Sequence, residues 1–410
     1  MTDSALENTC RRLGLFGGTF DPFHMGHRAM VQRACRELAL DRLLVMPVGR
    51  PPHKDRRISF AAYRYEMACR GSCDLDQVTV SDQEIRTPGL DYTYHTVLEL
   101  KELYRPEELF LIAGSDVLLS LDRWYRPEDL LQEVTLAVGV RGGDDSQAVL
   151  QEVLAVEKHF GCRVRLLDLP PLELSSSLLR DRLDGGEAVD DLCPPAVVSF
   201  LDQFKPYAFK AVFDLLSPLE WDRLLALEEA AWPFSSQARR LHAASVAQYA
   251  ARLAQVYGQP VLKAAAAGLL HDLAKELPRD RQLQAAASCQ AIPGLGGDEL
   301  TDDLLHGPAS ALLALELWGE EDEELLEAIA WHPTAHPRLS VLGQILYLAD
   351  KISYDRTFMN LAPIREAAEG GRLALAMKLC LEEVFKALEG EGKQASPISL
   401  EAHTYFAGQA

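Results

Sequence analysis

Short apolar runs alternate with amphipathic stretches along the first half of the chain. The runs predicted to be strands are residues 13–16, 43–47, 78–80, 109–113, 135–140 and 163–167. Two of the stretches between these runs, residues 28–40 and 92–104, repeat their apolar positions with the period of a helix. Strands that alternate with helices are typical of a parallel, doubly wound α/β sheet.

The strand pattern fades after about residue 210. Apolar positions then recur with a helical period over residues 219–230, 237–257, 261–276, 302–318, 323–331, 339–353 and 372–389. Pro206 and Pro218 bracket the change of pattern. We therefore predict an α/β domain over residues 1–207, a linker over 208–218 and an all-α domain over 219–410.

The charge balance narrows the range of partners. The 410 residues include 61 acidic and 41 basic side chains, which gives a formal net charge of -20. The first 210 residues hold 25 basic and 33 acidic side chains, so neither half of the chain is basic. This balance argues against a broad nucleic-acid interface and against binding to an anionic membrane. Any phosphate chemistry would therefore depend on local cations, main-chain amides or metal ions.

Other features predict a cytoplasmic protein. No apolar run approaches the roughly 18–20 residues of a membrane span. The first ten residues, MTDSALENTC, are polar and acidic and do not have the pattern of a signal peptide. Eight cysteines at wide spacings do not form a disulfide framework, so we expect reduced thiols. The oligomeric state stays open, and a homodimer is one possibility.

Four segments of the first half place phosphate-binding groups after strands or at helix starts. Residues 17–27, GGTFDPFHMGH, offer a glycine turn and two histidines on one face of a helical turn. The others are PPHK at 51–54, AGSD at 113–116 and SSSLLR at 175–180. Each segment alone also fits a plain turn or helix cap. Because ligands of parallel sheets bind beyond the carboxyl ends of the strands, we expect these segments to meet in one site.

The four motifs resemble those of the bacterial nicotinate-mononucleotide adenylyltransferases, which are HIGH-type nucleotidyltransferases with a Rossmann-like sheet. The resemblance covers about residues 12–205. It implies transfer of an adenylyl group from ATP, bound with Mg²⁺, to nicotinate mononucleotide in NAD biosynthesis, with release of pyrophosphate. A transferase for another acceptor, such as phosphopantetheine or a sugar phosphate, is the alternative.

The same resemblance assigns roles to individual residues. His24, His27, Lys54 and Arg180 would surround the triphosphate and stabilise charge, with no protein nucleophile. The remaining ATP-binding residues would be Gly17, Gly18, Thr19, Phe20, Gly114, Asp116, Ser175 and Ser176. The nicotinate mononucleotide side would comprise Tyr92, Thr93, Trp124 and Arg141, with Trp124 stacked on the pyridine. Two departures are His95, where the family usually has Asp, and Ser177, where it usually has Thr.

The second half carries an ordered series of histidines and aspartates on or beside predicted helices. They are His242, His271, Asp272, His306, His332 and Asp350. Mixed imidazole and carboxylate ligands favour iron, manganese or zinc, and an aspartate can bridge two ions. Each histidine alone fits a structural role. The pair His271 and Asp272, however, stands in the apolar stretch AAAAGLLHDLAKE, where an ionisable pair without a ligand would be costly to bury.

The surrounding motifs resemble the HD phosphohydrolases. They are RRLH at 239–242, HDLAK at 271–275, HGPAS at 306–310, WHPTAHP at 331–337 and YLADKISYDR at 347–356. More narrowly, they are similar to the bacterial HD-domain diadenosine tetraphosphatases, which cleave symmetrically to two ADP. The resemblance covers about residues 219–400, and one departure is Pro333, where the family often has Thr.

This second resemblance implies a dinuclear centre with iron favoured and manganese or zinc possible. His242, His271, Asp272 and Asp350 would hold one ion. Asp272 would bridge to a second ion, which His306 and His332 would hold. Lys275, one helical turn after His271, would pair with the phosphate chain. As alternatives, the all-α domain would sense nucleotides for the first domain or hydrolyse a different nucleotide.

Overall fold

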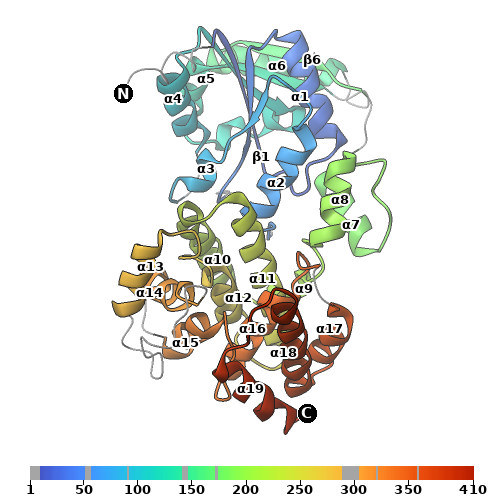
Figure 1. Cartoon of the computed structure of the whole chain (residues 1–410). Coiled ribbons are helices and arrows are strands. Elements are labelled where there is room, and N and C mark those ends of the chain that lie inside the picture. Colours follow the sequence, from blue (N-terminus) through green and yellow to red (C-terminus); the bar gives the residue numbers. More distant parts are fainter. Residues whose placement is uncertain are drawn as a thin grey trace. The chain divides into compact units, whose positions relative to one another are not determined.

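The computed structural model of the chain forms two compact units, Met1–Asp202 and Gln203–Ala410 (Figure 1). It describes residues 10–50, 57–89, 92–140, 146–170, 174–288, 304–319, 322–357 and 360–410.

The first unit contains a sheet of six parallel strands. The strands are β1 (Arg12–Gly18), β2 (Arg42–Pro47), β3 (Val78–Val80), β4 (Glu108–Gly114), β5 (Thr135–Val140) and β6 (Val164–Asp168). Their order across the sheet is β3-β2-β1-β4-β5-β6, with every pair parallel. The order reverses between β1 and β4, and in doubly wound sheets this reversal opens a ligand crevice at the carboxyl ends of the strands. The prediction of a parallel α/β sheet is confirmed.

Helices connect and flank these strands. They are α1 (Met25–Glu37), α2 (Ala61–Ser72), α3 (Gln83–Arg86), α4 (Thr93–Tyr104), α5 (Pro127–Glu133), α6 (Ser146–Phe160), α7 (Ser176–Asp184) and α8 (Pro195–Phe204), with 3-10 turns η1 (Ser115–Leu119) and η2 (Leu121–Arg123). The central strands are buried almost throughout, as expected for a parallel sheet that is covered on both faces. The predicted helix start at Ser175 is confirmed, because its Oγ accepts a hydrogen bond from the Leu178 amide at 3.2 Å.

Among the described residues, the second unit contains helices and no strands, which confirms the all-α prediction. The helices are α9 (Lys210–Phe213), α10 (Pro218–Ala231), η3 (Trp232–Phe234), α11 (Gln237–Val256), α12 (Val261–Leu270), α13 (Arg279–Ser288), α14 (His306–Trp318), α15 (Glu323–Trp331), α16 (Val341–Ile352), α17 (Leu361–Glu369), α18 (Leu373–Gly390) and α19 (Pro397–Ala407). No described helix is both long enough and apolar enough to cross a membrane.

Two glycines let helices approach closely beside the predicted metal ligands. A Cβ at Gly268, near the end of α12, would lie 2.5 Å from the Cα of Ala247 on α11. A Cβ at Gly307, directly after His306, would lie 2.4 Å from the carbonyl oxygen of Ala330 on α15. Both distances are too short for a side chain, so glycine is required where these helices come together.

One predicted helix ends early. The periodicity predicts a helix over residues 261–276, but α12 ends at Leu270 and consecutive turns follow. In these turns the Lys275 amide donates to the Asp272 carbonyl at 3.0 Å, a contact three residues apart rather than four. Apolar spacing alone does not distinguish such turns from a helix. Consequently, His271 and Asp272 lie in a turn at a helix end and not within a helix.

The segment predicted as a linker is partly helical and partly buried. Within residues 208–218, α9 forms a short helix, and Phe209, Val212, Phe213 and Leu216 are buried in the second unit. The Phe209 ring packs edge-on against Tyr249 of α11, with ring centroids 5.6 Å apart. The division of the chain at residues 207 and 219 stays a prediction.

Candidate functional site

The two histidines of the first motif cap the amino end of α1 reciprocally. His24 precedes the helix, and its Nδ1 accepts hydrogen bonds from the Gly26 amide at 3.1 Å and the His27 amide at 3.4 Å. In return, Nδ1 of His27 accepts a hydrogen bond from the His24 amide at 3.2 Å. The two rings are stacked with centroids 3.7 Å apart. Because both Nδ1 atoms are acceptors, each ring carries its proton on Nε2 and presents an N–H donor there.

Gly26 makes this arrangement possible. A Cβ on Gly26 would lie 3.0 Å from both Cε1 and Nδ1 of the His24 ring, so a side chain would push the imidazole out of its capping position. The glycine of the HMGH segment therefore leaves room for the histidine before it. The spacing of the two histidines allows them to cap the helix and also to present two Nε2–H donors.

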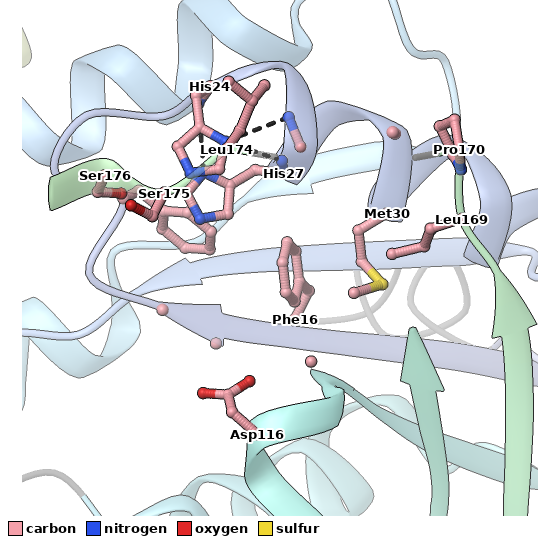
Figure 2. Close-up of a pocket in the computed structure, with 16 residues that line it drawn as sticks. Phe16, His24, His27, Met30, Asp116, Leu169, Pro170, Leu174, Ser175 and Ser176 are labelled. Carbon is pink, nitrogen blue, oxygen red and sulfur yellow. Dashed lines mark hydrogen bonds between the residues drawn. The ribbon is translucent and has the colours of Figure 1, made fainter. Parts of the chain in front are cut away.

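These imidazoles line a pocket of about 240 Å³ at the carboxyl ends of β1 and β4. Its other lining residues include Gly17, Gly18, Phe20, Gly114, Asp116, Ser175 and Ser176, all predicted to bind ATP. Figure 2 shows the histidines beside Ser175 and Ser176, with Asp116 across the pocket. A Cβ on Gly114 would lie 2.5 Å from Oδ1 of Asp116, so glycine is needed here for this carboxylate to take its place.

A second pocket of about 450 Å³ adjoins the first, a volume typical of small-molecule sites. Tyr92, Thr93 and Trp124, predicted for nicotinate mononucleotide, line it together with Thr19. The two pockets share Phe16, Gly17, Gly18, Gly114 and Asp116. Apart from Arg180, the structure thus brings the described members of both predicted sets together along the ends of β1 and β4.

The second pocket also contains residues that the sequence analysis did not single out. Glu84 of α3 lines it while almost fully buried, and its Oε1 accepts a hydrogen bond from the Thr96 hydroxyl at 2.8 Å. Tyr125, 4.7 Å from Tyr92 between ring centroids, also lines the pocket. The exposed ring of His95, 5.4 Å from that of Tyr125, adds to this aromatic group.

Arg180 was predicted to surround the triphosphate, but it lines neither of the two described pockets. Its guanidinium is buried and donates hydrogen bonds to the carbonyl of Asp21 and, at 3.1 Å, to Oγ of Ser177. It also lies 4.0 Å from the Asp21 carboxylate. Ser177 therefore offers the hydroxyl that the usual threonine would offer. Lys54 and Arg141 lie outside the described residues.

A fully buried arginine connects the loops that bear two of the motifs. Arg64 of α2 donates to the Ser59 carbonyl at 2.9 Å, the Val48 carbonyl at 2.6 Å, the Gly49 carbonyl at 3.2 Å and the Thr19 carbonyl at 3.3 Å. These carbonyls belong to the loops after β1 and β2 and to the segment before α2. Arg64 was not singled out from the sequence, and no spacing indicated these partners.

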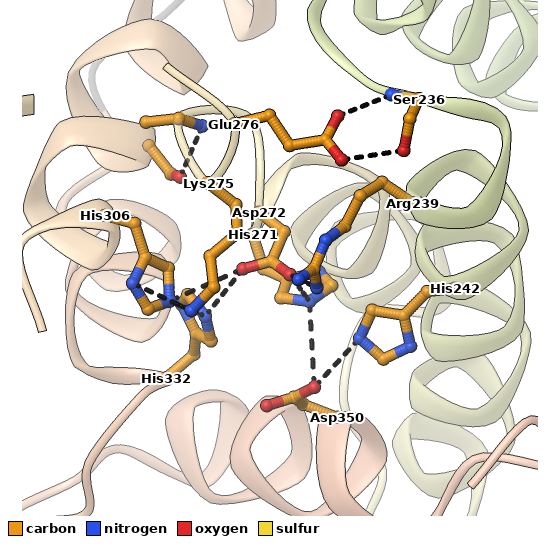
Figure 3. A network of polar contacts seen from close by, with 12 residues as sticks. Ser236, Arg239, His242, His271, Asp272, Lys275, Glu276, His306, His332 and Asp350 are labelled. Carbon is orange, nitrogen blue, oxygen red and sulfur yellow. Dashed lines mark hydrogen bonds and ion pairs between the residues drawn. The ribbon is translucent and has the colours of Figure 1, made fainter. Parts of the chain in front are cut away.

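In the second unit, the predicted metal ligands converge from five elements. His242 lies on α11, His271 and Asp272 follow α12, His306 begins α14, His332 follows α15, and Asp350 lies on α16. All six are buried. Two groups have ligand atoms within 4.8 Å of one another, namely His242, His271 and Asp350, and His271, Asp272 and His332. Figure 3 shows His242 and His306 on opposite sides of Asp272.

The nitrogen and oxygen atoms of this cluster are better suited to bind a cation than to hydrogen-bond with one another. Nδ1 of His271 donates to the Gly268 carbonyl at 2.7 Å, and burial lowers the pKa of this imidazole to about 3, so its Nε2 carries a lone pair. That Nε2 faces Oδ2 of Asp272 at 3.7 Å and Oδ1 of Asp350 at 3.8 Å. Both Nε2 of His271 and Oδ1 of Asp272 are buried without a hydrogen-bond partner. Such acceptors facing acceptors are expected where a metal ion binds.

His306 extends the second group. Its Nε2 lies 3.5 Å from Oδ1 of Asp272 and 3.2 Å from Nε2 of His332. Burial, with the nearby His332, lowers the pKa of His306 to about 2, so the imidazole is neutral and able to bind a metal. Asp272 Oδ1 also lies 3.3 Å from Nε2 of His332. Asp272 thus faces His271, which both groups share, through Oδ2, and it faces His306 and His332 through Oδ1.

Four cations surround this centre. Arg239 donates to Oδ2 of Asp272 at 2.9 Å, and Nζ of Lys275 lies 3.1 Å from Nε2 of His306. Lys351 and Arg356 pair with Asp350. Burial alone would raise the pKa of Asp350, but these two cations, Lys351 foremost, hold that pKa well below its usual value. The sequence analysis named only Lys275 among the four. The other three stand in the quoted motifs RRLH and YLADKISYDR, but their spacing gave no sign of the contacts.

Comparison with known proteins fits this geometry. The cytidylyltransferase-like family matches residues 15–182, and the HD domain family matches residues 239–355. A "Probable nicotinate-nucleotide adenylyltransferase" from Clostridium botulinum (strain Alaska E43 / Type E3) is 34% identical over 198 residues, covering 48% of this chain and 98% of that protein. One of the same name from Desulfitobacterium hafniense (strain Y51) is 35% identical over 194 residues, covering 47% and 94%.

The chain belongs to the nicotinate-nucleotide adenylyltransferase family. The protein is an enzyme with a nucleotidyltransferase domain and an HD domain of the hydrolase type. Among solved structures, a predicted HD superfamily hydrolase involved in NAD metabolism from Clostridium acetobutylicum is 30% identical, covering 45% of this chain and 96% of that chain, with a TM-score of 0.42. HD domains bind divalent metals, and the buried imidazoles and carboxylates are the candidate ligands in this chain.

Proposed function

We propose that the first unit transfers the adenylyl group of ATP to nicotinate mononucleotide, with deamido-NAD and pyrophosphate as products. The observation that carries this proposal is the pair of adjoining pockets that share Gly17, Gly18, Gly114 and Asp116. One pocket holds phosphate-binding groups, and the other holds aromatic rings suited to a pyridine. A phosphate of the acceptor and the α-phosphate of ATP would meet at the shared boundary.

In this mechanism the acceptor phosphate oxygen attacks the α-phosphorus of ATP, and the bond to the bridging oxygen of the β-phosphate breaks. The attacking phosphate is already anionic at neutral pH, so no general base is needed. The protein aligns the reactants and stabilises the charge that moves onto pyrophosphate. The Nε2 donors of His24 and His27 suit this task, with Lys54 and Arg180 as further proposed cations and Mg²⁺ arriving with ATP.

Residues of the second pocket would select the acceptor. Trp124, Tyr92 and Thr93 line this pocket, and Trp124 is proposed to stack on the pyridine while Arg141 binds charge. The rival is a different phosphate acceptor. A panel of nicotinate mononucleotide, nicotinamide mononucleotide, phosphopantetheine and a sugar phosphate, each with ATP, decides between them. Higher kcat/KM for a substrate without a pyridine would reject the proposal.

For the second unit, we propose metal-dependent hydrolysis of diadenosine tetraphosphate to two ADP. The supporting observation is that two buried atoms, Nε2 of His271 and Oδ1 of Asp272, lack hydrogen-bond partners within a cluster of imidazoles and carboxylates. His242, His271, Asp272, His306, His332 and Asp350 would hold one or two ions, for which iron is favoured and manganese and zinc are alternatives. Bound ions would supply a water of lowered pKa and neutralise phosphate charge.

The chain's own cations would complete this site. The water oxygen would attack one of the two central phosphorus atoms, and the bond to the bridging oxygen between them would break, which leaves two ADP. Lys275, which contacts His306, and Arg239, which contacts Asp272, are proposed to bind phosphate oxygens. The alternatives are hydrolysis of another nucleotide and nucleotide sensing without turnover. Incubation of the metal-loaded chain with diadenosine tetraphosphate, with product analysis, tests them, and an absence of ADP would leave the alternatives.

The proposed partners are small nucleotides, namely ATP, nicotinate mononucleotide and diadenosine tetraphosphate. A cytoplasmic location and a homodimer stay predictions from the sequence.

A further inference from the structure

His242 of the proposed metal centre differs from His271 and His332 in the type of oxygen that its Nδ1 contacts. Nδ1 of His271 contacts the carbonyl of Gly268, and Nδ1 of His332 contacts the carbonyl of Ile329, both at 2.7 Å and both three residues earlier in the chain. Nδ1 of His242 instead lies 2.7 Å from a carboxylate oxygen, Oδ2 of Asp355. Asp355 is 113 residues away in the sequence and lies after the end of α16.

The carboxylate of Asp355 is held firmly in this position. Its other oxygen, Oδ1, accepts a hydrogen bond from the Ser353 hydroxyl at 2.6 Å. The side chain of Asp355 is only 12% exposed, and Ser353 is fully buried. Because His242 donates from Nδ1 to this carboxylate, its Nε2 points at Oδ1 of Asp350, 3.0 Å away. Asp355 therefore fixes which nitrogen of His242 faces the metal centre.

A carboxylate behind a ligating imidazole makes that imidazole a stronger ligand than a carbonyl does, because it increases the electron density on the ring. Only the first group of ligands, His242, His271 and Asp350, includes an imidazole for which the structure shows this support. In the second group, centred on Asp272 and His332, the neighbouring His306 has both ring nitrogens within 3.2 Å of the Lys275 ammonium. Cations lie beside both groups, because Arg356 contacts Nε2 of His242 at 2.9 Å and pairs with Asp350. The carboxylate behind His242 is therefore the feature that distinguishes the first group.

We propose that Asp355 is a positioning residue that makes the position formed by His242, His271 and Asp350 the tighter of two unequal metal positions. The inference rests on the proposed metal centre and adds to it an order of filling. The first ion would enter beside His242, and the second, weaker ion would enter between Asp272, His306 and His332. Metal supply would then control whether the second position is filled.

The test is a titration of the metal-free full-length chain with Mn²⁺, with the free ion measured by electron paramagnetic resonance. Wild type should show two classes of site with distinct affinities. Asp355→Asn keeps the size and an oxygen acceptor but removes the charge, so the tighter Kd should rise about 10-fold to 100-fold while the weaker Kd stays unchanged. Glu366→Gln, which removes an exposed carboxylate of α17 in the same unit, is the matched control and should change neither value.

Ser353→Ala provides a second variant in case Asp355→Asn does not fold, as judged by circular dichroism. It leaves the charge of Asp355 but removes the hydrogen bond that holds it, so the tighter Kd should rise several-fold. Two unequal sites in wild type, with only the tighter one weakened in the variants, support the proposal. A folded variant with an unchanged tighter Kd, or with both values weakened equally, overturns it. Wild type that binds no Mn²⁺ would overturn the proposed metal centre as well.

Discussion

His24 and His27 each accept a hydrogen bond from the main-chain amide of the other, at 3.4 and 3.2 Å respectively. This reciprocal contact uses Nδ1 of both rings, so each ring carries its N–H donor on Nε2. The same contacts form the cap of α1, which means that helix stability and the proposed phosphate contact depend on different atoms of one ring. The two roles can therefore be separated by substitution.

Replacing His27 by Ala should lower kcat for adenylyl transfer by roughly 100-fold to 1,000-fold, because one positioned donor to the leaving pyrophosphate is lost. It should also destabilise the first unit by about 1 kcal/mol through the lost cap. His27→Asn keeps an acceptor near the position of Nδ1 but has no donor at Nε2. This variant should unfold in urea like wild type and still lose the activity. Normal kcat in His27→Asn would contradict the assignment.

Trp124→Ala should raise the KM for nicotinate mononucleotide at least 10-fold more than the KM for ATP, since the stacking partner is lost on one side only. Steady-state kinetics with each substrate varied in turn measure the difference. Tyr104→Ala is a suitable control, because Tyr104 packs against the same core but does not line either described pocket. Equal changes in both KM values would show that Trp124 only fills the core.

Arg64→Lys should destabilise the first unit by about 3 kcal/mol, because an ammonium cannot reach all four carbonyls that the guanidinium now satisfies. The KM for ATP should rise as well, since the loops after β1 and β2 lose their common anchor. Urea unfolding measures the first effect. Arg33→Lys, at an exposed ion pair with Glu37, should change stability by under about 0.5 kcal/mol. If Arg64→Lys behaves like Arg33→Lys, the anchoring role is refuted.

Asp272→Ala should abolish hydrolysis of diadenosine tetraphosphate and release bound metal, because this carboxylate faces His271 through one oxygen and His306 and His332 through the other. His306→Ala should keep about one metal per chain yet lose most turnover. Metal analysis of the purified proteins by mass spectrometry gives both values. Asp280→Ala, an exposed carboxylate at the start of α13, should retain the metal content of wild type. Retention of both metals by Asp272→Ala would argue against the bridging role.

The strands and the motif residues could be predicted because their signals are local. The apolar runs that became β1, β2, β4 and β5 are buried on both faces, and such runs are readable without knowledge of their neighbours. The glycines at the end of β1 and the histidines that follow this strand stand at fixed offsets from the strand end. The topology of a parallel sheet then brings them to the same edge as Asp116 and Ser176.

The remaining contacts are set by the tertiary fold. Asp355 meets His242 across 113 residues, and Arg64 meets the Thr19 carbonyl across 45, so no spacing rule reveals either pair. Arg180 stands in the first turns of α7 and was predicted to bind phosphate, yet its guanidinium turns toward Asp21. The early end of α12 at Leu270 was missed because turns and helix share an apolar spacing.

One chain is proposed to carry two separate nucleotide activities. Both are measured at once by chromatography of the products after the metal-loaded chain is incubated with ATP, nicotinate mononucleotide and diadenosine tetraphosphate. Wild type should form deamido-NAD and ADP. His27→Ala should lose only deamido-NAD, and Asp272→Ala should lose only the ADP that comes from diadenosine tetraphosphate. Loss of both products in either variant, or no ADP from wild type, would refute two separate activities.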